Sequence, residues 1–154
     1  MKRHPALIPL SQDHHHGLAL ALRCRKQSLG QLKPMGVEGL RARAREFTDF
    51  FSNNLVRHFQ AEEEVVFPLL NSGTSEMAAL IRELLADHEK IREMDRALRS
   101  ETGLAKVLFD AGDLLERHIR REERELFPLL DQCFGLADGD VLRGRIEKIL
   151  AGAD

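Results

Sequence analysis

The sequence predicts an all-α protein, namely an antiparallel up-down-up-down four-helix bundle with a short C-terminal helix. Apolar residues recur at the spacing of one helix face almost throughout the chain. The alternation of β-branched and polar residues that indicates strands is not found. Clusters of glycine, proline and small polar residues divide the pattern into four long segments joined by short links, which favours antiparallel neighbours.

The first two long segments are predicted from their caps and breakers. The first helix covers residues 11–30, with Ser11 as its N-cap, and it ends before a connection that contains Pro34. The second helix covers residues 37–67, and Pro68 disturbs its end because proline lacks the backbone N–H that continues a helix.

The third and fourth segments follow the same logic. A polar turn ends in Thr74 and Ser75, either of which can cap a helix over residues 76–100. Gly103 marks the next break, and the fourth helix covers residues 104–127.

A short last helix is predicted at about 138–150, beginning at Asp138 or Asp140. The chain has 154 residues, which suits one domain that buries roughly two-thirds of the surface of its unfolded chain. We therefore expect a single domain over residues 1–154, with its core at about 11–130.

Composition excludes several classes of function. The 23 basic and 25 acidic residues give a net charge of −2, so neither a disordered chain nor a basic nucleic-acid binder is indicated. The N-terminal apolar stretch is too short for a signal peptide or a membrane span, and we expect a cytoplasmic protein with no membrane or nucleic-acid partner. Cys24 and Cys133 lie too far apart for a CxxC motif and are expected to be reduced packing residues. The sequence does not identify a protein partner and does not predict the oligomeric state.

An internal repeat relates the two halves of the chain. Residues 58–71 align with residues 118–131 and share a histidine, two adjacent glutamates, a Phe-Pro pair and two leucines. A smaller repeat places Asp-His at Asp13-His14 and again at residues 87–88. The chain is therefore predicted to consist of two helix pairs in tandem.

Helical geometry places one glutamate of each repeat beside its histidine. At about 100° per residue, His58 and Glu62 differ by about 40° and share the apolar face, as do His118 and Glu122. The glutamate one position later lies about 140° from that histidine, so Glu63 and its counterpart Glu123 are expected to face solvent.

The position of each remaining histidine relative to the apolar residues of its helix predicts whether it faces the core. His88 continues the apolar stripe of the third helix. In the triple histidine, His14 lies near the centre of the stripe, His15 at its edge and His16 on the opposite side, so His14 is the inward residue. His4 and His16 are expected at the surface.

The inward residues are predicted to meet in one layer of the core. They lie at nearly equal distances, within two to four residues, from the turns near Pro34, Gly73 and Thr102. Such a mismatch corresponds to roughly 3 to 6 Å along a helix. The predicted cluster contains four histidines and two glutamates: His14, His58, Glu62, His88, His118 and Glu122.

A metal is the favoured explanation of this cluster, although a single inward histidine is more often a hydrogen-bonded core residue. Two buried carboxylates would cost several kcal/mol each without a cation among them. Nitrogen and oxygen donors without sulfur suit iron, manganese or zinc. Six donors exceed the four of a structural zinc site, so two metal ions bridged by carboxylates are the economical interpretation.

The order of these motifs resembles the hemerythrin-like family, the HHE cation-binding domain, over about Ser11 to Leu130. The motifs are Asp-His, HxxxE followed by Phe-Pro, and then the same pair again. The resemblance implies a four-helix bundle around a non-haem di-iron centre whose two iron ions are bridged by Glu62 and Glu122. It further implies that His14 and His58 serve one iron, and that the other two inward histidines serve the second.

Two departures from the oxygen-carrying members bear on function. Those proteins have a second histidine one turn from the third-helix histidine, whereas Leu84 and Arg92 occupy those positions here. Their last motif is HxxxxD, but Glu123 stands at that spacing and Glu122 is the expected ligand. By resemblance, the iron near His88 then has an open position for water, O2, peroxide or nitric oxide.

Three functions follow as hypotheses. The first is a di-iron protein that binds O2 or a related diatomic molecule as a sensor, store or scavenger. The second is a redox enzyme or iron donor that uses the same centre, such as a peroxidase, a ferroxidase or a protein of iron-sulfur cluster repair. The third is a helical interaction domain that is metal-free or stabilised by zinc. His15 replaces His14 as the ligand only if the first helix is rotated, and Asp13 and Asp87 are candidate partners of the histidines.

Overall fold

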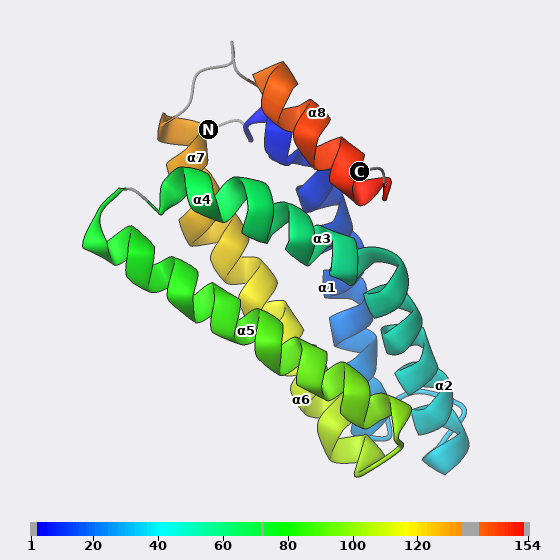
Figure 1. The fold of residues 1–154 in the computed structure, drawn as a ribbon. Coiled ribbons are helices and arrows are strands. Elements are labelled where there is room, and N and C mark those ends of the chain that lie inside the picture. The colour runs from blue at the N-terminus through cyan, green and yellow to red at the C-terminus, as the bar shows by residue number, and fades with distance from the viewer. Residues whose placement is uncertain (1–2, 72, 134–138, 153–154) are drawn as a thin grey trace.

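The computed structural model describes residues 3–71, 73–133 and 139–152, and in these ranges the long elements are all helices (Figure 1). No strand occurs in the described ranges, which agrees with the predicted all-α class. Asp138, one of the two predicted starts of the last helix, and the side chain of Cys133 lie outside the described residues.

The first helix begins earlier than the sequence predicts. A 3₁₀ turn, η1 (Pro5–Leu7), leads directly into α1 (Ile8–Ser28), and the imidazole of His4 caps η1 by accepting a hydrogen bond from the amide of Ala6. Proline is tolerated in the first turn of a helix because that N–H has no helical partner. Ser11 therefore lies inside the helix and is not its N-cap.

The second long segment is helical throughout but contains two wider turns. In order, it consists of α2 (Gly36–Phe50), the π-helical turn η2 (Phe51–Leu55), α3 (Val56–Ala61), the π-helical turn η3 (Glu62–Val66) and α4 (Phe67–Leu70). The start agrees with the prediction to one residue, and the helix continues past Pro68 instead of ending before it.

The second half of the chain repeats this pattern. It consists of α5 (Ser75–Arg99), α6 (Leu104–Arg121), the π-helical turn η4 (Glu122–Leu126), α7 (Phe127–Cys133) and α8 (Gly139–Leu150). Thr74 caps α5 by accepting a hydrogen bond from the amide of Met77. Gly103 adopts the left-handed conformation, with φ 58°, at the predicted break before α6.

The prolines account for two of the π turns. Pro68 and Pro128 lack an N–H for a bond to the carbonyl four residues earlier, and their rings crowd that carbonyl. The turns η3 and η4 end two residues before them and widen the helix at that point. Each of these two π turns begins at an inward glutamate, Glu62 or Glu122.

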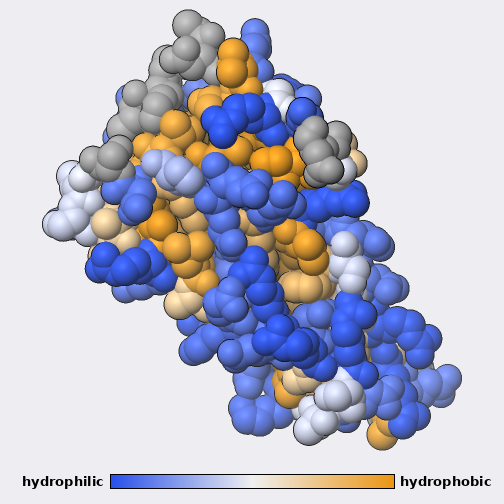
Figure 2. All heavy atoms as spheres, in the orientation of Figure 1, coloured by the Kyte–Doolittle hydropathy of each residue, from blue (hydrophilic) through white to orange (hydrophobic). Residues whose placement is uncertain are grey.

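The helices enclose two apolar clusters with a polar layer between them. α1 packs mainly against α6 and also against α2, while α5 packs against α6 and α2, and α8 covers η1 and α3. Along α5, Leu84 belongs to one cluster and Ile91 to the other, with His88 between them. Figure 2 shows hydrophobic residues gathered over the end of the bundle near α4 and α7 and mainly hydrophilic residues at the opposite end. Among the described residues, no helix combines the length and apolar character needed to cross a membrane.

The close packing of α1 on α6 depends on Gly112. A Cβ atom at this position would lie 2.7 Å from the carbonyl oxygen of Ala21, and a backbone atom cannot move away cheaply. Gly112→Ala is therefore expected to destabilise the protein by about 1–3 kcal/mol, as overpacking does. Gly144→Ala on α8 is the matched control, because its Cβ meets nothing within 4 Å and the change raises helix propensity. Thermal unfolding should shift in opposite directions for the two variants, and equal shifts would contradict the packing argument.

Candidate metal centre

The six residues predicted to face inward all lie buried in the polar layer. His14 is 3% exposed, and the other five are exposed by 1% or less. They come from α1, α3, η3, α5, α6 and η4: His14, His58, Glu62, His88, His118 and Glu122. His15 and His16 are exposed, so α1 presents only His14 to the core.

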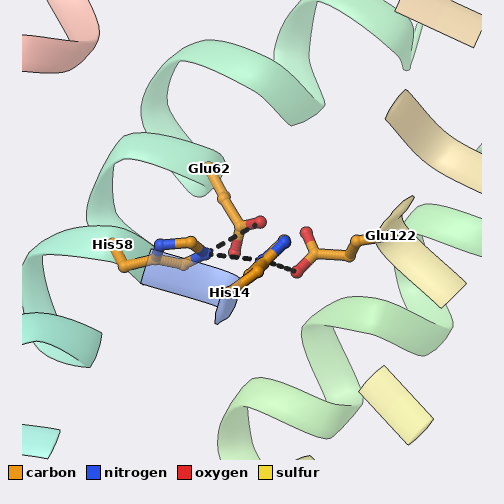
Figure 3. Close-up of side chains that lie close together, drawn as sticks. All are labelled: His14, His58, Glu62 and Glu122. Atoms are coloured by element: carbon orange, nitrogen blue, oxygen red, sulfur yellow. Dashed lines mark hydrogen bonds and ion pairs between the residues drawn. The ribbon is translucent and has the colours of Figure 1, made fainter. Parts of the chain in front are cut away.

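The six side chains form two groups of four that share both glutamates. The first group is His14, His58, Glu62 and Glu122, whose side chains point toward one another in Figure 3. The second group replaces the two histidines by His88 and His118. Within each group, four ligand atoms, one from each residue, lie within 4.8 Å of one another.

Distances across the layer are short. In the first group, Nε2 of His14 lies 3.1 Å from Nε2 of His58 and 3.4 Å from Oε1 of Glu122. In the second group, Nε2 of His88 lies 3.1 Å from Oε1 of Glu62. Nε2 of His118 lies 2.9 Å from Oε1 of Glu122. All four histidines thus direct Nε2 toward the two carboxylates.

This donor set fits a metal. Oε2 of Glu62, both carboxylate oxygens of Glu122 and Nε2 of His118 are buried and form no hydrogen bond of good geometry. Buried polar atoms in folded proteins normally have hydrogen-bond partners. A cation bound between these carboxylate oxygens and the histidine nitrogen would supply the missing partner and the missing positive charge. Imidazole and carboxylate donors without a thiolate suit iron, manganese or zinc.

Without a bound cation, the two buried carboxylates have pKa values that are shifted in opposite directions. Burial, together with the neighbouring Glu122, raises the pKa of Glu62 to about 8. Burial opposes ionisation of Glu122 as well, but the charge of His118 and the close contacts of the neighbouring side chains hold the pKa of Glu122 well below its usual value. In the absence of a metal, ionisation of Glu62 is therefore opposed and ionisation of Glu122 is favoured.

The histidines supply the positive charge. Burial lowers the pKa of His118, but the charge of Glu122 and a hydrogen bond to Asp87 outweigh it and raise the pKa to about 10. Burial likewise lowers the pKa of His14, but the close contact with Glu122 and the hydrogen bond to Glu123 outweigh it and raise the pKa above the usual value. Metal ions would replace these protons as the counter-charge of the glutamates.

The outer nitrogen of two histidines is held by Glu63 and Glu123, which the helical periodicity of the sequence predicts to face solvent. Nδ1 of His14 donates to Glu123 at 2.7 Å, and Nδ1 of His88 donates to Glu63 at 2.6 Å. The expectation for Glu63 and Glu123 was wrong because each lies at the edge of the buried face of its helix, where its carboxylate reaches the histidine of a neighbouring helix. Their side chains are 30% and 27% exposed, so they connect the centre to the surface.

Aspartates hold the other two histidines. Nδ1 of His58 donates to Asp13 at 3.1 Å, and Nδ1 of His118 donates to Asp87 at 3.1 Å. These are the two aspartates that the sequence offered as candidate partners. A carboxylate on Nδ1 fixes the ring orientation and leaves Nε2 directed at the centre.

Phenylalanine rings surround the histidines. Phe59 stacks on His88 with ring centroids 3.8 Å apart, and Phe67 stacks on the same ring at 5.6 Å. Phe127 stacks on His14 at 5.4 Å. These contacts limit ring rotation and keep water from the layer.

Three other positions are settled by the structure. His4, expected at the surface, is only 3% exposed, because its ring caps η1 and lies against Gly139 of α8. Leu84 lies in the apolar core, one turn before His88. Arg92, one turn after His88, pairs with Glu63 and Glu89, so α5 provides no second histidine.

Comparison with known proteins identifies the family. The sequence profile of the "Hemerythrin HHE cation binding domain" matches residues 8–130, a range that contains all six residues of the layer. No curated protein and no solved structure gave a significant match. The chain therefore belongs to the hemerythrin HHE cation-binding family.

Proposed function

We propose that this protein holds two iron ions and binds O2 or a related small diatomic molecule there, for sensing, storage or scavenging. The observation that carries the proposal is the pair of buried four-residue groups that share Glu62 and Glu122. Two ions bridged by these carboxylates account for the shared residues, and manganese or zinc would suit the same donors. We also infer that the four long helical segments run antiparallel in an up-down-up-down course.

Each residue has a defined part in this proposal. His14 and His58 would hold one ion, and His88 and His118 the other. When bound, reduced iron supplies electrons and open coordination positions for a diatomic ligand. Because each group of four residues would give an ion four protein donors at most, the arrangement would leave room for such a ligand beside the histidines.

The residues around the six donors would hold the centre in a geometry that suits such a ligand. The aspartates and glutamates on Nδ1 keep each histidine ring in position, so little reorganisation is needed when the ions bind. The stacked rings of Phe59, Phe67 and Phe127 exclude bulk water and favour a small, uncharged ligand.

A di-iron redox enzyme or iron donor is the second candidate, because the open positions would also admit peroxide. Turnover of peroxide, oxidation of added ferrous iron or transfer of iron to a metal-free cluster protein would favour it. Reversible ligand binding without turnover would favour the first candidate.

Metal content tests the proposal directly. Anaerobically purified protein is expected to contain about two irons per chain by elemental analysis. Protein concentration should come from amino-acid analysis, because the chain has no Trp or Tyr. His58→Ala and Glu122→Ala are each expected to lower the metal content substantially, since each removes a donor. His16→Ala is the control, because His16 is exposed. Equal metal in all three variants would contradict the ligand assignment.

A further inference from the structure

His88 is held by a carboxylate and an arginine that also contact its stacked ring. Glu63 accepts from Nδ1 of His88 at 2.6 Å, and Nη2 of Arg92 donates to the same carboxylate oxygen at 2.9 Å. The guanidinium of Arg92 lies over the ring of Phe59, with its carbon 5.5 Å from the ring centroid. Phe59 in turn stacks on His88. Arg92 therefore contacts two of the groups that restrain this histidine, Glu63 and Phe59.

His14 has a similar arrangement, built from a different part of the chain. Glu123 accepts from Nδ1 of His14 at 2.7 Å, and Nη2 of Arg3 lies 3.3 Å from the other oxygen of that carboxylate. Unlike Glu63, Glu123 also accepts a hydrogen bond from the hydroxyl of Ser11 at 2.8 Å. The guanidinium of Arg3 lies 5.4 Å from the centroid of Phe127, which stacks on His14. Nη1 of Arg3 also donates to Asp131 of α7 at 2.6 Å.

The remaining two histidines lack this addition. Asp13 and Asp87 each bond the Nδ1 of one histidine, and the described residues include no arginine or lysine in ion-pair contact with either aspartate. The centre thus has two histidines whose Nδ1 is bonded by an aspartate that no arginine contacts in the described ranges, and two whose Nδ1 is bonded by a glutamate that an arginine also contacts.

We propose that Arg92 and Arg3 are positioning residues, each acting on one half of the metal centre. This inference rests on the proposed function. A charged hydrogen bond from arginine fixes the glutamate, and the fixed glutamate keeps the Nδ1 hydrogen on its histidine and Nε2 directed inward. The guanidinium over the phenylalanine adds a second restraint on the same ring. Arg92 serves the half with His88, and Arg3 serves the half with His14.

The two arginines differ in how they are anchored. Arg92 is on α5 itself, one turn from its histidine. Arg3 precedes η1, and it is tied to α7 through Asp131, which also accepts from the amide of His4 at 2.6 Å. Loss of Arg3 is thus expected to leave α5 and its half of the centre unchanged, and loss of Arg92 is expected to leave the other half unchanged.

Histidine side-chain NMR of the full-length protein loaded with Zn²⁺ tests this assignment, because zinc is diamagnetic. The readout is the rate at which each Nδ1 hydrogen exchanges with water, together with release of zinc to a chelator. In Arg92→Gln, exchange at His88 is expected to accelerate about tenfold, and one of the two zinc ions should leave about tenfold faster. In Arg3→Gln, the same change is expected at His14 only.

Matched variants separate positioning from a general loss of structure. Glu89→Gln removes a surface partner of Arg92 and is expected to leave exchange at His88 unchanged, since Glu89 is 67% exposed and contacts no histidine. Arg92→Lys retains the charge beside Glu63 and should restore most of the wild-type rate, and it also serves if the glutamine variant does not fold. Equal acceleration at His14 and His88 in both arginine variants would overturn the proposal, as would unchanged exchange in zinc-loaded variants. Wild-type protein that binds no metal would overturn the proposed function itself.

Discussion

Removal of the bound metal with a chelator is expected to lower the melting temperature by roughly 5 to 15 °C. A ligand present at 100 to 1,000 times its Kd adds about 3 to 4 kcal/mol to the free energy of unfolding, and each kcal/mol shifts the melting temperature of a domain of this size by about 2 to 4 °C. The physical cause is the charge of the buried Glu62 and Glu122, which would lose their counter-ions. Thermal unfolding followed by circular dichroism, with and without chelator, measures the shift.

The control for this prediction is a variant that retains much less metal. Glu122→Ala should show a much smaller shift between the two conditions than the wild type, because it has little bound metal to lose. Wild-type protein that loads two metal ions but melts identically after chelation would contradict the argument that the ions neutralise buried carboxylates.

Glu62→Gln is expected to abolish metal retention and yet stabilise the metal-free protein above neutral pH. The pKa of Glu62 is raised to about 8 from an ordinary value of 4.5, so the folded state binds the extra proton between these two values. The free energy of unfolding of the metal-free wild type must therefore fall as the pH rises through this window. The loss is of the order of 3 to 5 kcal/mol, and glutamine cannot ionise, so the variant escapes it.

Chemical denaturation of metal-free protein at pH 5 and pH 8 measures this difference. His118 causes a decline that both proteins share, since its pKa is raised to about 10 and its stabilising charge is lost only as the pH rises from 6.5 towards that value. Glu64→Gln, two residues away and exposed, is the matched control and should keep the wild-type pH dependence. A variant Glu62→Gln that loses as much stability as the wild type would contradict the assignment of the proton to Glu62.

The helices could be predicted from the sequence because apolar spacing reports directly which face is buried. The three π turns could not be predicted this way. A π turn widens the helix locally without changing which residue types are apolar, and a periodicity of about 100° per residue averages over it. The only signal is Pro68 and its counterpart Pro128, which as helix breakers predict helix ends but instead follow η3 and η4 within a continuing helix.

The inward histidines and glutamates could be identified because each interrupts an apolar stripe. Glu63 and Glu123 were missed because their angles were measured against the histidine of their own helix, whereas each bonds a histidine of another helix. The doubled glutamate in both repeats was the signal that could have found them. His4 was missed because it stands outside the periodic pattern, although the adjacent Pro5 marks the start of a helical turn.

The sharing of Glu62 and Glu122 between the two groups makes each half of the chain depend on the other. Each half of the chain contributes two of the histidines, one shared glutamate, one aspartate and one outer glutamate, and neither half contains a complete group. Two identical copies of a single helix pair, related by a two-fold axis, would bring together the same donors. The centre is thus of a kind that a homodimer of helical hairpins can form, although the two halves differ here at positions such as Phe59 and its counterpart Ile119.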